Sequence, residues 1–204
     1  MPTILLIRHA ENEYVAKGRL AGRLPGVHLN EKGRQQAKAL ARALAKVPLK
    51  AIYSSPLERC LETAQPLAAA HNLDVIPRQG LIEIDFGNWQ GKTLKQLRRR
   101  RLWPVVQHNP ARLTFPEGES FAAAQLRLVD EIERLVAQHK PKDLIACFSH
   151  SDCIRLLLAY YLGVPLDLFQ RLAISPASVS SLMFGERAVR ILGVNQQIDL
   201  PFKK

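Results

Sequence analysis

The chain of 204 residues contains few cysteines and no long apolar run. Cys60, Cys147 and Cys153 form neither a C-x-x-C pair nor an even set, which argues against a disulfide framework or a zinc site and favours a reducing compartment. No segment approaches the ~20 consecutive apolar residues of a membrane helix, and too few apolar residues precede Arg8 for a signal peptide. We therefore expect a cytoplasmic protein without a metal or a membrane partner.

Aromatic residues are also scarce, at 6% of the chain, whereas cations are in excess. The 29 Lys and Arg residues against 18 Asp and Glu residues give a formal charge of +11, which attracts anions such as phosphorylated metabolites or nucleic acid. A nucleic-acid site is better supported where aromatic residues interleave the cations on strands. The arginine run 98–101 has Trp103 as its one nearby aromatic residue, and such a run is typical of a solvated helix face. We expect a small phosphorylated partner and no nucleic acid.

Apolar segments alternate with amphipathic ones along most of the chain, which indicates an α/β architecture. Strands are expected at 3–7, 50–55 and 143–149, helices at 29–47, 55–70, 120–139 and 152–162, and an antiparallel hairpin at 178–194. Segment 86–118 breaks this alternation with loops and a basic helix at 93–101. We predict a single domain, 1–204, with a three-layer α/β/α fold, a mainly parallel central sheet, one antiparallel edge hairpin and a small cap-like insertion around 86–118.

The helix expected at 55–70 has an explicit start signal. Ser55 suits the N-cap, Pro56 the first helical position, and Glu58 completes an S-x-x-E capping box. This start places Arg59 about one turn into the helix, just beyond the end of a strand.

Two apolar strands run directly into histidines. Residues 4–7 lead into Arg8 and His9, and residues 144–148 lead towards His150. In open α/β sheets ligands bind outside the carboxyl ends of the strands. Either histidine taken alone is more often an ordinary surface or core residue, but Arg59 also follows a strand and lies near a helix N-terminus, where an anion is favoured. Such cations repel one another by several kcal/mol unless an anion lies between them, and phosphate matches the forked donors of arginine.

Three other phosphate or nucleophile patterns are excluded. The stretch GNWQGKT, 87–93, has three residues between its glycines where a P-loop needs four. No cysteine is followed by the x5-Arg spacing of cysteine phosphatases, and no G-x-S-x-G elbow occurs. Glu83 and Asp85 alternate with apolar residues, and beside an anion pocket one of them can serve as a proton donor.

Five segments, in order, resemble motifs of the histidine phosphatase superfamily, the phosphoglycerate mutase-like proteins. LLIRHAE resembles the R-H-G-E start, LNEKGRQQA the L-T-x-x-G-x-x-Q-A helix, YSSPLERCLETA the S-S-x-L-x-R-x-x-x-T-A stretch, LIEIDFGNWQG the L-x-E-x-x-F-G-x-W-E-G segment, and FSHSDCIRLLL the S-H-G-x-x-I-R segment. The resemblance covers nearly the whole chain.

The resemblance implies a phosphohistidine mechanism. His9 would be the nucleophile, and nearby arginines would disfavour its protonated form and leave a lone pair available. Glu83 would protonate the leaving oxygen and then activate water, with Asp85 as the second choice for that proton. No metal or cofactor is implied, because cationic side chains supply the charge.

The resemblance also implies which residues hold the phosphoryl group. Arg8, Arg59 and His150 would bind its oxygens and stabilise the transition state. Asn12 and Ser151 are carried over as substrate-binding residues.

This chain departs from the family pattern at four positions. Ala10 replaces a glycine, Asn12 a serine or threonine, Val15 an asparagine that touches phosphate, and Ser151 a glycine. The length of the chain is similar to that of the compact phosphatase branch, which includes alpha-ribazole phosphatase-like proteins. We therefore predict a metal-independent phosphatase, monomeric or homodimeric. The alternatives are a cofactor-dependent phosphoglycerate mutase-type phosphomutase, a catalytically weakened phosphate-binding regulatory protein and, more weakly supported, a nucleic-acid-binding protein.

Overall fold

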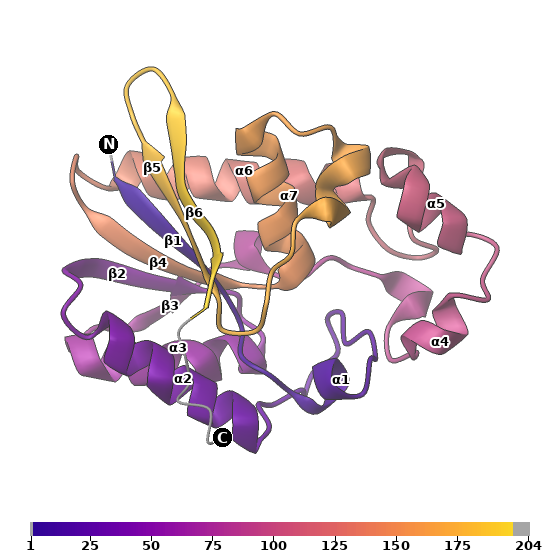
Figure 1. Ribbon diagram of the computed structural model, residues 1–204, viewed down its shortest axis with the longest axis horizontal. Coiled ribbons are helices and arrows are strands. Elements are labelled where there is room, and N and C mark those ends of the chain that lie inside the picture. The colour runs from indigo at the N-terminus through magenta and orange to yellow at the C-terminus, as the bar shows by residue number, and fades with distance from the viewer. Residues whose placement is uncertain (1, 198–204) are drawn as a thin grey trace.

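A six-stranded sheet forms the centre of the computed structural model, which describes residues 2–197 (Figure 1). Its strands are β1 (Thr3–Arg8), β2 (Leu49–Ser54), β3 (Val75–Pro77), β4 (Leu144–Ser149), β5 (Val179–Phe184) and β6 (Val189–Gln196), in the order β3-β2-β4-β1-β5-β6. The pairs β2/β3, β2/β4 and β1/β4 are parallel, whereas β1/β5 and β5/β6 are antiparallel. The predicted mainly parallel sheet with an antiparallel edge hairpin is confirmed.

Helices cover both faces of the sheet. Helices α2 (Glu31–Leu44) and α3 (Glu58–His71) lie on one face, and α6 (Phe121–Gln138) and α7 (Ser151–Leu162) on the other. The described residues also form α1 (Glu13–Ala16), α4 (Leu94–Leu97) and α5 (Trp103–His108), with 3-10 turns η1 (Gln79–Leu81), η2 (Gly87–Trp89), η3 (Pro110–Arg112) and η4 (Leu166–Arg171). Leu5 and Ile7 of β1 pack with α2 and α3, and the alternate residues Ile4 and Leu6 pack with α6 and α7. These two cores give the three-layer α/β/α arrangement that the sequence predicts (Figure 1).

Two helix boundaries follow directly from local chemistry. The Asn30 side chain accepts a hydrogen bond from the backbone N–H of Gly33 and caps α2, as its sequence position predicts. Helix α7 ends at Gly163, which adopts a left-handed conformation with φ of 67°.

The start of α3 differs from the predicted capping box. The helix begins at Glu58, its N-cap is Leu57, and no side chain caps it. The Ser55 hydroxyl instead lies 2.8 Å from Nε2 of His150, and the Glu58 carboxylate accepts from the backbone N–H of Gly26. The prediction of Ser55 as the N-cap is wrong because contacts with distant residues engage these side chains. Arg59 is consequently the second residue of the helix.

The basic helix expected at 93–101 is shorter than predicted. Only Leu94–Leu97 is helical, with a capping box between Thr93 and Gln96, and the arginines 98–101 follow the helix as exposed residues. The arginine run offers no apolar side chain to hold a helical face against the protein, and its like charges repel one another.

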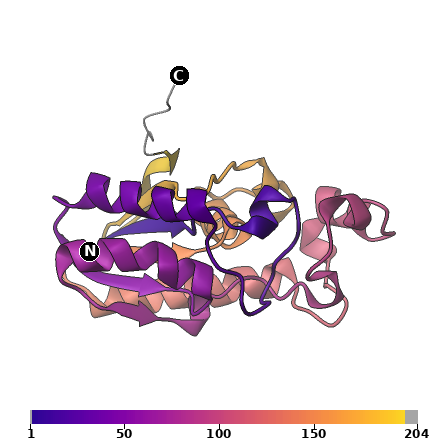
Figure 2. The same cartoon turned by 90° about the horizontal axis from the view of Figure 1, so that it is seen from below.

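The segment 86–118 contains η2, α4, α5 and η3, and it lies at one end of the molecule beyond the sheet (Figures 1 and 2). The ring centroid of Phe115 lies 5.0 Å from that of Phe86 and 5.4 Å from that of Trp89, both in the same segment. It also lies 5.2 Å from the centroid of Phe121, and this contact anchors the segment to α6. The interpretation of this segment as a cap stays a prediction.

Among the helices within residues 2–197, none combines the length and apolarity needed to cross a membrane.

Candidate active site

The sheet brings the two predicted histidines together. Strands β1 and β4 are parallel neighbours with Arg8 opposite Ser149, so the residues that follow them, His9 and His150, leave the same edge side by side. Their ring centroids lie 5.3 Å apart, in an edge-to-face arrangement. Arg59 reaches this edge from α3, which follows the neighbouring strand β2.

The geometry of His9 leaves one ring nitrogen free to react. Its Nδ1 lies 2.8 Å from the carbonyl oxygen of Ala10, which can only accept, so Nδ1 carries a proton and Nε2 carries the lone pair. Burial, followed by the charges of Arg59 and Arg8, lowers the pKa of His9 well below its ordinary value. The imidazole is therefore neutral near pH 7, as a nucleophile requires.

Arg59 is a buried cation and Arg8 a partly buried one, and both have unused donors. Arg59 is 1% exposed; its Nη2 donates to the carbonyl of Gly22 at 2.7 Å and lies 3.2 Å from Nδ1 of His150. Its Nε and Nη1, and Nε of Arg8, are buried and find no hydrogen-bond partner in the described part of the chain. Unsatisfied buried donors on a cation are costly, and an anion would satisfy them.

These side chains face a cavity of about 110 Å³. A cavity this small suits a compact ligand such as a tetrahedral oxyanion. Its lining includes six of the predicted site residues, namely Arg8, His9, Asn12, Arg59, Glu83 and Ser151.

Glu83 lies in this cavity with one oxygen fixed. Its Oε1 accepts hydrogen bonds from the backbone N–H of Ile84 at 2.9 Å and from the thiol of Cys153 at 3.3 Å. Burial, followed by the charge of Asp152, raises the pKa of Glu83 to about 7. A carboxyl group with this pKa can both donate and accept a proton near neutral pH.

Asp85, the second choice for the proton donor, has a different place. It is not among the residues that line the cavity. Its Oδ1 accepts from the backbone N–H of Gly87, and its Oδ2 lies 3.5 Å from Nη1 of Arg23. Asp85 therefore organises the loop, and the geometry favours Glu83.

His150 lies behind the cavity. It is fully buried; Nδ1 faces Arg59, and Nε2 lies 2.8 Å from the Ser55 hydroxyl. Burial, followed by the charge of Arg59, lowers its pKa well below the ordinary value, so the 3.6 Å approach of Nδ1 to Oε2 of Glu83 is not an ion pair near neutral pH. His150 contacts His9 and Arg59 but is not itself among the cavity-lining residues, so its direct contact with a phosphoryl oxygen stays a prediction.

Asn12 and Ser151 are both at helix starts beside the cavity. Asn12 caps α1 by accepting from the backbone N–H of Val15, and its buried amide nitrogen finds no partner within residues 2–197. Ser151 is the first residue of α7, where backbone N–H groups and the helix dipole favour an anion. Both positions fit the predicted binding of phosphate.

The departures from the family pattern have distinct settings. Ala10 is buried among Leu29, Ala37 and Ala177, and it does not line the cavity. Val15 does line it and contributes an apolar group there.

Sequence reasoning missed Tyr14, Arg19 and Asp152, which also line the cavity. The Arg19 guanidinium lies 4.9 Å above the Tyr14 ring and donates to the carbonyl of Gly91. No local motif distinguishes these residues; only the position of Asp152 two residues after His150 offered a signal. Over the described residues, no three His, Cys, Asp or Glu side chains gather as metal ligands.

Comparisons with known proteins show the family of the chain. Residues 4–197 match the family model of the histidine phosphatase superfamily (branch 1). The chain is 35% identical to phosphoserine phosphatase 1 of Hydrogenobacter thermophilus, over 96% of this chain and 92% of the relative. It is 31% identical to the 2,3-bisphosphoglycerate-dependent phosphoglycerate mutase of Thermoplasma acidophilum, over 88% and 86% of the two chains.

Solved structures show the same fold. Bacillus stearothermophilus YhfR has a TM-score of 0.90 at 26% identity, covering 96% of this chain and 98% of that one. A mycobacterial glucosyl-3-phosphoglycerate phosphatase has a TM-score of 0.87 at 28% identity, covering 96% and 99%. With a family model spanning nearly all of its residues, the chain belongs to the histidine phosphatase superfamily.

Proposed function

We propose that the protein is a metal-independent phosphatase that hydrolyses a small-molecule phosphomonoester through a phosphohistidine on His9. The observation that carries this proposal is the buried Arg59 guanidinium, whose Nε and Nη1 lack partners in the described residues and which lines an oxyanion-sized cavity with His9. The names of the related phosphatases support the reaction class.

The reaction has two steps. In the first, the lone pair on Nε2 of His9 forms a bond to phosphorus, the bond from phosphorus to the ester oxygen breaks, and protonated Glu83 gives its proton to that oxygen. In the second, the Glu83 carboxylate takes a proton from a water molecule, whose oxygen attacks phosphorus and breaks the bond to His9. Inorganic phosphate leaves, and both side chains return to their starting states.

The cations stabilise the negative charge in both transition states. Arg8 and Arg59 offer the unused N–H donors described above, and such prearranged charge supplies most of the catalysis in phosphoryl transfer. His150 holds Nη2 of Arg59 and packs against the His9 ring, so it positions the two groups that touch phosphate.

The alternative is a phosphomutase, which is favoured by the 31% identity to a phosphoglycerate mutase. A mutase transfers the phosphoryl group from the histidine to a second alcohol, whereas a phosphatase transfers it to water. The partition of a phosphorylated enzyme between water and an added phosphoglycerate distinguishes the two reactions.

The test uses purified protein, phenyl phosphate and excess chelator. We expect release of inorganic phosphate, and a phosphoryl group on His9 that is stable in base and labile in acid, detected by mass spectrometry after rapid quenching. His9→Ala should lose both signals, and His108→Ala, which alters an exposed histidine, should keep them. Phosphatase activity that needs a metal and survives His9→Ala would reject the proposal. Tight binding of inorganic phosphate without a phosphoprotein or turnover would favour the regulatory alternative.

A further inference from the structure

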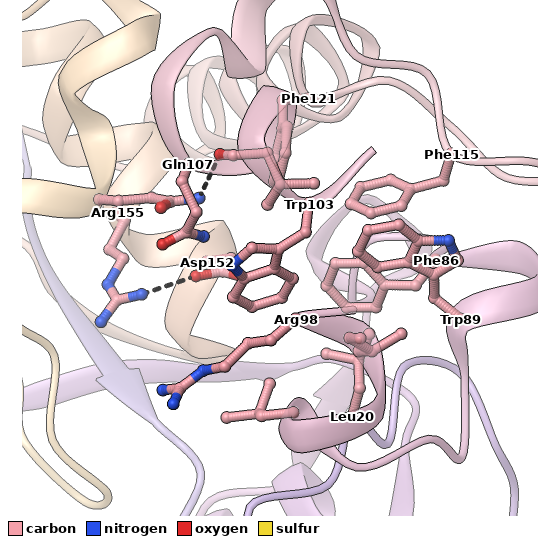
Figure 3. Close-up of a pocket in the computed structure, with 14 residues that line it drawn as sticks. Leu20, Phe86, Trp89, Arg98, Trp103, Gln107, Phe115, Phe121, Asp152 and Arg155 are labelled. Atoms are coloured by element: carbon pink, nitrogen blue, oxygen red, sulfur yellow. Dashed lines mark hydrogen bonds and ion pairs between the residues drawn. The ribbon is translucent and has the colours of Figure 1, made fainter. Parts of the chain in front are cut away.

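A second cavity, of about 300 Å³, adjoins the cavity beside His9. Figure 3 shows the residues that line this second cavity. Three of them, Leu20, Phe86 and Asp152, also line the 110 Å³ cavity beside His9, called the phosphate cavity below, so the two spaces share a wall. Its volume lies at the lower end of the range for ligand pockets, which are usually preformed and mainly apolar.

One side of this second cavity is aromatic. Figure 3 shows Phe86, Trp89 and Phe115 grouped on that side, with Trp103 facing them. The Trp89 and Trp103 rings are stacked with centroids 6.3 Å apart, and the Phe86 and Phe115 rings meet edge to face at 5.0 Å. Phe86, Trp89 and Phe115 are at most 3% exposed, so packing fixes this wall.

The polar side is already partly engaged. The Asp152 carboxylate accepts from Nη1 of Arg155 at 2.9 Å, and the Gln170 amide donates to the carbonyl of Val106 at 3.0 Å. Nε of Arg155 is buried and has no partner within residues 2–197, so one donor stays free on this side. A small leaving group that carries an ammonium and a carboxylate can use this donor but leaves the aromatic wall uncovered. An apolar ring would cover the wall and gain by leaving water.

The position of Glu83 indicates that the leaving group of the substrate extends towards the second cavity. Glu83 lines the phosphate cavity, and Phe86, three residues further along the same segment, lines both cavities. An alcohol oxygen that takes its proton from Glu83 thus lies beside the entrance to the second cavity.

We infer that the second cavity binds the leaving group, and that the preferred substrates are phosphomonoesters of alcohols that carry a bulky, ring-sized apolar group. This inference rests on the proposed function and adds the substrate class. The side chains that select the substrate are then those of the aromatic wall, most of which, including Trp103, belong to segment 86–118. Arg98 of the same segment also lines this cavity.

The test compares 2-phenylethyl phosphate with ethyl phosphate. Both release a primary alcohol of similar basicity, so the ratio of their kcat/KM values reports the binding of the ring alone. We expect a ratio of at least about tenfold in favour of the phenylethyl ester, because even small apolar groups are worth that much in a fitted pocket. Phosphoserine is a small ionic ester, so its kcat/KM should be close to that of ethyl phosphate and below that of 2-phenylethyl phosphate.

Filling the cavity should remove the preference. Val106→Phe places a ring in the second cavity, and we expect the ratio to fall towards one, with the fold of the variant checked by circular dichroism and thermal melting. Leu94→Trp, at a lining residue that is 38% exposed, makes the same test without changing a buried side chain. Leu126→Phe is the matched control, since Leu126 lies on α6 outside both cavities and is 61% exposed.

The outcomes separate this inference from the proposed function. A wild-type ratio near one, or an unchanged ratio in both filling variants, overturns the inference while phosphatase activity stands. If wild-type protein hydrolyses neither ester and forms no phosphohistidine, the proposed function fails, and the substrate class falls with it.

Discussion

Replacing Glu83 by glutamine isolates the proton transfer in the proposed reaction. The new amide would keep an acceptor for the N–H of Ile84 but could neither give a proton to the leaving oxygen nor take one from water. General acid–base catalysis of this kind contributes about 10² to 10⁴ in rate. We therefore expect Glu83→Gln to lower kcat/KM for ethyl phosphate by about 10² to 10⁴, and by much less for 4-nitrophenyl phosphate, whose leaving group needs little protonation.

The pH profile gives a second readout of the same change. Because the pKa of Glu83 in the free protein is raised to about 7, the protonated acid is lost above that pH, and kcat/KM should fall about tenfold for each further pH unit. In Glu83→Gln this alkaline fall should be absent. The substrate's own ionisation affects both proteins equally, so the ratio of wild type to variant isolates the carboxyl group.

The assay is phosphate release from ethyl phosphate between pH 5 and 9, with Asp85→Asn as the matched control. Asp85 contacts Arg23 and the Gly87 N–H outside the cavity, so its variant should keep the alkaline fall and most of the rate. The reasoning is refuted if Glu83→Gln retains more than about a tenth of the activity on ethyl phosphate, if the ratio of wild-type to variant kcat/KM does not fall above pH 7, or if Asp85→Asn shows the larger loss.

Three further predictions concern stability. The pKa of Glu83 is raised from 4.5 to about 7 in the folded protein, so between these pH values the folded state holds a proton that the unfolded chain releases. The free energy of unfolding should therefore fall by about 3 kcal/mol as pH rises from below 4.5 to above 7. Urea titrations should show this fall in the wild type and not in Glu83→Gln. Equal pH dependence in both proteins would contradict this. Gly33→Ala should cost about 2 kcal/mol by urea denaturation, since a Cβ there would lie 1.9 Å from the backbone oxygen of Glu11, and an unchanged midpoint would show that α2 shifts freely. Inorganic phosphate at about 100 times its Kd should stabilise the wild type by ~2.7 kcal/mol in thermal melts, and the same concentration should not stabilise Arg59→Met. An equal gain in the variant would show that the anion binds elsewhere.

The convergence of the two histidines could be predicted from the sequence because it depends on topology. A strand pattern ending at His9 and another ending before His150, in an α/β alternation, are enough to place both histidines at one sheet edge. The Asn30 cap of α2 also depends only on its neighbours in the chain. Where a local signal has no distant competitor, it predicts the structure.

Distant contacts and weak local patterns account for the features that the sequence could not predict. The Ser55 hydroxyl contacts His150 instead of capping α3, and the helix beyond Leu97 stops where apolar contacts stop. The strand Val75–Pro77 is three residues long, too short for a periodic pattern, and Tyr14 of α1 and Arg19 shortly after it line the cavity from a segment without a motif. For Ser55 the deciding partner lies far away in the chain, whereas for β3 and α4 the local pattern is too short or too highly charged to set the boundary.

The placement of β1 has a consequence for the order of events during synthesis. β1 is made first, yet its two neighbours in the sheet, β4 and β5, begin at Leu144 and Val179. Both edges of this apolar strand therefore stay open until most of the chain has left the ribosome, and pairing over such sequence distances is slow. A nascent chain that stops before Leu144 has His9 and Arg59 but lacks the strand β4 that aligns them, so the proposed phosphate site forms only late in translation.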